Sequence, residues 1–232
     1  MRFGIRHIMA LVAVGAIFLG GCNAMNIDKE DAQKILKEKY HKEFVVSDIV
    51  GTYVGYKTMI AYPKDASNVS FSLIMDERGN LIDRYIARCM GTQIEDKIKN
   101  ELQDYKDGIF VRADIQNVEN HDIGPDTPVE EYLKKNPDRN VYVVMYVDKE
   151  YLNGLEMREV IDTAIRNVSG KGTLRVYMAD QMTFPTIKQH FSKYDTSYGE
   201  LDNVMGKLPS IVFEFNENKT KNSINAIDEL FA

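Results

Sequence analysis

The stretch Val141-Tyr142-Val143-Val144-Met145-Tyr146-Val147 contains no charged residue and is rich in valine. Such a continuous apolar run is typical of a central strand that is covered on both faces. A helical pattern follows at residues 155–168, and apolar residues alternate again from Leu174 to Met178. Because a helical connection joins parallel strands, this order predicts a partly parallel sheet.

The rest of the second half supplies further elements around this strand–helix–strand core. Alternating apolar residues predict a strand at residues 109–115, and Pro185 lies near the start of a predicted helix at 184–193. A last strand is expected at 211–215 and a short helix at 224–230. We therefore predict a mixed α/β unit over residues 108–232.

The first half has a different pattern, in which several short apolar runs follow one another and few helices are predicted. Asp28 is a good N-terminal cap for a helix at about residues 28–41. The segment Asp76-Glu77-Arg78-Gly79-Asn80 indicates a hairpin turn, because Gly79 and Asn80 tolerate positive φ. Short connections favour antiparallel neighbours, so we predict a helix plus an antiparallel meander over residues 28–107. Its expected strands are 44–50, 52–62, 69–75 and 81–89, and a second helix is expected at 92–106.

Composition agrees with a folded protein. The chain has 232 residues, of which 44% are hydrophobic and 28% charged, which is enough to build a buried core. The formal net charge is −6, and lysines alternate with acids along the chain. Because phosphate recognition needs clustered lysine and arginine, we expect no nucleic-acid partner.

The N-terminus carries the most specific signal. Arg2 and Arg6 precede an uncharged apolar stretch from Ile8 to Phe18, which is short for a membrane span. The following Leu19-Gly20-Gly21-Cys22 resembles the lipobox of bacterial lipoproteins. This resemblance implies cleavage between Gly21 and Cys22, lipid on the Cys22 thiol and a location on the outer face of the cell membrane.

By this interpretation residues 1–21 are a removed signal peptide and residues 22–27 are a short lipidated tether. After cleavage the chain has no segment able to span a bilayer, so buried acyl methylenes, each worth about 0.8 kcal/mol, would hold it. The alternative is an ordinary signal peptide that ends at a chance cysteine.

Motifs for catalysis and metal binding are absent from the sequence. His41, His121 and His190 are isolated, and Cys89 is the one cysteine left once Cys22 is lipidated. No metal-ligand spacing, nucleophile motif or phosphate loop is present. We therefore predict no cofactor, no metal and no catalytic residues.

Four tyrosines form the candidate binding surface. Tyr53, Tyr56 and Tyr62 share the strand-rich region, and Tyr85 lies nearby in the sequence. Tyrosine combines a large apolar area with a polar tip, which suits a recognition surface. The alternative is that these tyrosines simply line a half-exposed sheet.

A second resemblance covers about residues 28–106. Ala32-Gln33-Lys34-Ile35-Leu36, Ala61-Tyr62-Pro63-Lys64-Asp65 and Asp83-Arg84-Tyr85 look like segments of small exported lipoproteins of unassigned function from Gram-positive-type bacteria. The helix-plus-meander unit is also similar to PepSY and cystatin-like folds. These resemblances imply an extracytoplasmic binding or structural module and supply no site residues.

Two functions follow from these patterns. The first is a non-enzymatic module, held at the membrane through Cys22, that binds an envelope or extracellular protein or a small ligand. The alternative is an anchored hydrolase or wall-modifying enzyme with a dispersed active site. A transporter's substrate-binding component is a third, less favoured alternative, because the mature chain is small for two ligand-closing lobes.

The lipobox yields a direct test. We expect the mature protein in the membrane fraction with acyl chains on Cys22, and we expect Cys22→Ala to abolish this modification because the acceptor thiol is gone. Intact-mass spectrometry of both forms measures this. A water-soluble mature chain with an unmodified Cys22 would contradict the prediction.

Overall fold

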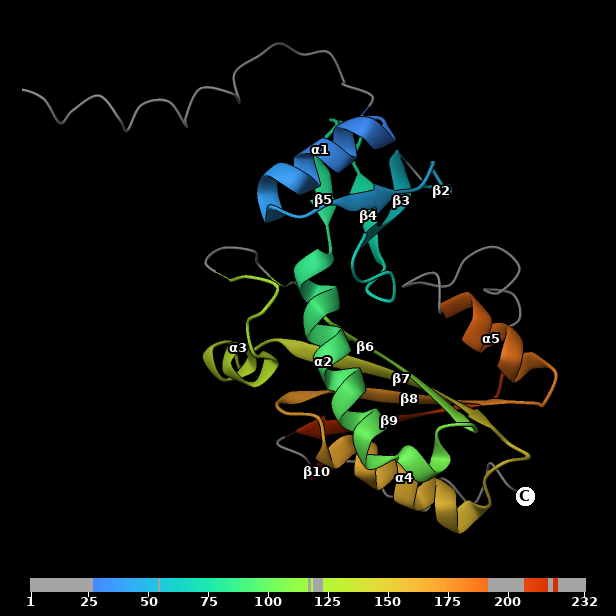
Figure 1. Ribbon diagram of the computed structural model, residues 1–232. Helices are drawn as coiled ribbons and strands as arrows, with labels where there is room; N and C mark the ends of the chain where they lie inside the picture. The colour runs from blue at the N-terminus through green and yellow to red at the C-terminus, as the bar shows by residue number, and fades with distance from the viewer. Residues whose placement is uncertain are drawn as a thin grey trace, which may run out of the picture.

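A computed structural model describes residues 27–53, 55–116, 118, 123–191, 207–216 and 219–220. The lipobox, Cys22 and the predicted helix at 224–230 lie outside these residues. The described chain forms two five-stranded sheets with helices against them, which confirms the predicted α+β class (Figure 1).

The first sheet is an antiparallel meander under one helix. Helix α1 begins after Asp28, whose side chain accepts a hydrogen bond from the Asp31 backbone N–H at 2.9 Å, as expected for a cap. The strands run in the order β1-β3-β4-β5, and β2 also pairs with β3. The elements are α1 (Lys29–Tyr40), β1 (Phe44–Val46), β2 (Gly51–Tyr53), β3 (Tyr56–Pro63), β4 (Phe71–Met75) and β5 (Leu81–Asp83).

The second sheet has the order β10-β9-β8-β7-β6. Strands β7 and β8 are parallel and joined by α4, whereas the other pairs are antiparallel, so the partly parallel sheet is confirmed. The elements are α2 (Tyr85–Glu101), the 3-10 helix η1 (Gln103–Tyr105), β6 (Ile109–Ile115), α3 (Val129–Lys135), β7 (Asn140–Asp148), α4 (Gly154–Arg166), β8 (Lys171–Ala179), α5 (Thr183–Phe191), β9 (Ser210–Asn216) and β10 (Lys219–Thr220).

Strand β7 has apolar residues on both faces because both faces of its sheet are covered. The face that carries Val143 and Met145 belongs to the larger core, which also includes buried residues of α2 and α4. The opposite face carries Tyr146, which packs with Phe184 and Phe191 of α5. The larger core continues without a break into the first sheet.

Two strand predictions need correction. The run 52–62 is a tight hairpin in which Tyr53 pairs with Tyr56, and Gly55 at φ +79° makes the turn. The predicted strand 81–89 ends at Asp83, and the helix expected at 92–106 begins at Tyr85. Fully buried side chains recur here at a four-residue spacing, as expected for the inner face of a helix. These residues are Ile86, Met90, Ile94 and Ile98.

Helix α2 connects the two sheets. It starts beside the first sheet and runs across to the second, where it packs against β6 (Figure 1). Helix α2, which the sequence placed in the first unit, contributes to the one core that both sheets share.

The contact between α2 and β6 depends on a buried ion pair. Glu95 Oε1 accepts a hydrogen bond from the Ala113 backbone N–H at 3.0 Å, and the Arg88 guanidinium lies 3.5 Å from the Ala113 carbonyl oxygen. Arg88 and Glu95 bond each other at 2.5 and 3.0 Å. The pair thus satisfies the outward-facing peptide groups of Ala113 in this edge strand. A side chain at Gly91 would approach the Ala113 carbonyl oxygen to 2.1 Å, so this close packing requires glycine.

Glu95 is charged in spite of its burial. Its side chain is 2% exposed, and burial alone would raise its pKa. The Arg88 guanidinium, helped by Arg112 and Lys99, instead holds the pKa of Glu95 below its usual value. One buried carboxylate therefore interacts with three cations.

This arrangement predicts a large penalty for removing the carboxylate alone. Glu95→Ala leaves Arg88 buried without its partner, and we expect a loss of about 3–5 kcal/mol of unfolding free energy in urea. The control is Glu131→Ala, which breaks the exposed pair with Lys135 and should cost less than about 0.5 kcal/mol. Equal effects of the two substitutions would contradict this role of Glu95.

Candidate functional site

The four predicted tyrosines do not form one surface. Tyr56 is 46% exposed and Tyr62 is half-buried on β3, whereas the described part of Tyr53 is its backbone pairing with Tyr56. Tyr85 is 2% exposed, and its ring lies in the core, 5.1 Å from that of Phe44. The interpretation of Tyr85 as a surface residue is therefore wrong, because the start of α2 turns it inward.

A cavity of about 390 Å³ lies where β5 leads into α2. Its walls come from the first sheet, from the first turn of α2 and from the end of β6. Segments far apart in the sequence thus form a single concave site. The lining residues are Ile74, Ile82, Asp83, Arg84, Ala87, Ile115, Gln116 and Val118.

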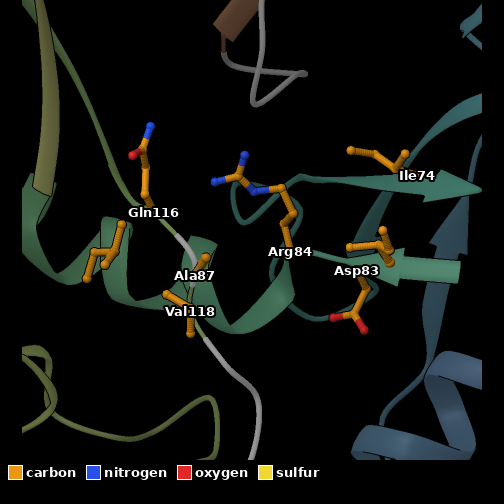
Figure 2. A pocket seen from close by; sticks show the side chains of 8 residues that line it. Ile74, Asp83, Arg84, Ala87, Gln116 and Val118 are labelled. Carbon is orange, nitrogen blue, oxygen red and sulfur yellow. The ribbon is translucent and has the colours of Figure 1, made fainter. Parts of the chain in front are cut away.

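Two polar side chains extend along one side of this cavity. In Figure 2 the Arg84 guanidinium and the Gln116 carboxamide reach in the same direction, and Ile74 points toward Arg84. The Arg84 guanidinium forms an ion pair with Asp114 of β6. This pair fixes Arg84 and largely neutralises it, while Gln116 offers both a donor and an acceptor.

Asp83 lines the cavity but directs its carboxylate away from Arg84 (Figure 2). Its side chain is 7% exposed and accepts hydrogen bonds from the Tyr40 hydroxyl at 2.5 Å and from Lys39 Nζ at 2.7 Å. Burial, reinforced by this hydrogen bond, raises the pKa of Tyr40. Asp83 therefore attaches the end of α1 to the strand–helix junction that carries Arg84.

The cavity has the chemistry of a binding site. Its apolar walls include Ile82, which is 51% exposed. Its polar groups are the Gln116 amide, the paired Arg84 guanidinium and the Asp83 carboxylate, which bonds Tyr40 and Lys39. Among the residues that the structure describes, no three His, Cys, Asp or Glu side chains are grouped to hold a metal. Burial raises the pKa of the nearby Cys89 thiol, which disfavours its nucleophilic thiolate form.

The sequence did not reveal Arg84, Gln116 or Ile82 as site residues. Arg84 fell inside a predicted strand, where a charged residue indicates only a solvent-facing position. The change from strand to helix between Asp83 and Tyr85 was the signal that could have marked this junction.

Within the described chain, no helix combines the length and the apolar character that a membrane span needs. No family model and no curated protein matches the sequence. Among solved structures, the fold is similar to the crystal structure of a DUF5037 family protein from Ruminococcus gnavus, with a TM-score of 0.64 and 16% sequence identity. The match covers 86% of this chain and 97% of that chain, and it shows the fold alone.

The junction beneath the site can be tested through Asp83. Asp83→Ala leaves the half-buried Tyr40 hydroxyl without its acceptor, and we expect a loss of about 1–3 kcal/mol in urea unfolding. Asp48→Ala serves as the control, because Asp48 pairs with Lys29 while 88% of its side chain is exposed. A change no larger than that of the control would show that this hydrogen bond does not hold the junction.

Proposed function

We propose that this protein is a non-enzymatic, lipid-anchored binding module on the extracytoplasmic face of a bacterial membrane. The Leu19-Gly20-Gly21-Cys22 segment supports the anchor and the location. The cavity at the start of α2 supports binding, and it is the single observation that carries this part of the proposal.

The chemistry of the cavity favours a peptide segment of an envelope or extracellular protein. Because Arg84 is paired with Asp114, the site offers little net charge to attract an ion. An apolar side chain of the partner would enter between Ile82 and Val118, and Gln116 would bond a backbone amide. Buried apolar anchors with a few oriented polar groups are the usual basis of such recognition.

Photo-crosslinking in intact cells tests this proposal. A photoreactive residue at Gln116, which is exposed on the rim, should capture a protein of defined mass. Adding Ile82→Asp places a charge on the apolar wall and should abolish the capture. The matched control is Leu155→Asp on α4, where the native side chain is 80% exposed and does not line the cavity, and which should leave the capture unchanged.

Two results would count against the proposal. Absence of any captured protein would contradict partner binding at this cavity. Capture that persists with Ile82→Asp would show that the apolar wall does not contribute to recognition.

A further inference from the structure

A second cavity, of about 410 Å³, lies at the opposite end of α2. It is bounded by the last turn of α2, by η1, by β6 and by α5. It shares no lining residue with the cavity at the start of the helix. The lining residues are Lys99, Leu102, Gln103, Lys106, Ile109, Phe110, Val111 and Lys188.

The rim of this cavity is positively charged. Three of the lining residues are lysines, and none of the described lining residues is acidic. Lys106 and Lys188 are exposed, and in the described part of the chain neither has a carboxylate partner. Lys99 lies 3.3 Å from Glu95, but that carboxylate is already shared with Arg88 and Arg112. Among the described residues that line the cavity, the cations therefore outnumber the acids.

The floor of the cavity is apolar. Leu102, Ile109 and Val111 are at most 5% exposed, so they belong to the core. The half-buried Phe110 ring lies on the opposite face of the edge strand β6, where it packs against Phe191, and the Arg112 guanidinium lies 5.9 Å from its centroid. An apolar floor beneath a cationic rim matches a ligand that has an apolar body and an anionic end.

We propose that this second cavity binds a single-chain anionic amphiphile of the fatty-acid type. The acyl chain lies along the edge of β6, against Leu102 on one side and the Phe110 ring on the other. The carboxylate is held by Lys106 and Lys188, whose flexible ammonium groups act as point charges. This site differs in position and in charge from the cavity at the start of α2. Its existence does not depend on the proposed function.

The test uses octanoate as the probe and the mature lipoprotein in phosphatidylcholine nanodiscs, with empty nanodiscs to correct for partition into lipid. Calorimetry should give saturable binding, and octanoate should protect Lys106 and Lys188 from acetylation as measured by mass spectrometry. Lys106→Ala/Lys188→Ala should weaken binding about tenfold, because each exposed ion pair contributes up to about fivefold. Lys134→Ala/Lys135→Ala on α3 removes the same charge away from the cavity and should leave the affinity unchanged.

Matched ligands separate the contributions of charge and chain. Octanol and octylammonium should bind at least about tenfold more weakly than octanoate, because they lack the anion that pairs with the lysines. Inorganic phosphate should compete weakly, because it has no chain for the apolar floor. Equal affinity for octanol, equal competition by phosphate or full affinity in Lys106→Ala/Lys188→Ala would each overturn the proposal. Unchanged thermal unfolding of both double variants would show that the fold is intact.

Discussion

The buried ion pair between Arg88 and Glu95 determines where α2 lies, and much of the molecule is arranged around that helix. The pair bonds both peptide groups of Ala113, so a helix takes the position that a further strand would occupy beside β6. Gly91 allows the two backbones to approach closely at the same point. An ion pair at this depth is costly to desolvate, and it is stable here because Arg112, Lys99 and the Ala113 backbone N–H share the charge of Glu95.

Fixing α2 in this way also positions both cavities. The first turn of the helix carries Ala87 to the end of β6, and the last turn brings Lys99 and Leu102 toward α5. The two cavities differ in charge because Arg84 pairs with Asp114 at one end, whereas Lys106 and Lys188 are not paired within the described chain at the other. A single helix thus separates a nearly neutral site from a cationic one.

The elements that could be predicted are those with a clear local period. Strand β7 and helix α4 show such patterns, and β8 follows with its own alternation, so their order predicted the parallel pair. Residues 81–89 were misread because a short apolar run fits a strand and a buried helix equally well. The segment forms a helix because of its contacts with β6, which is distant in sequence. Both cavities arise from such long-range contacts, whereas the anchor at Cys22 stays a prediction from a local motif.

The hydrogen bonds between α2 side chains and the Ala113 backbone have a consequence for self-assembly. An edge strand with free peptide groups can recruit a strand from another molecule and so extend a sheet indefinitely. In β6 the middle of that edge is already bonded to side chains of α2, and an incoming strand would have to displace a buried ion pair to reach it. The bonds at Ala113 therefore act against strand addition in the middle of this edge.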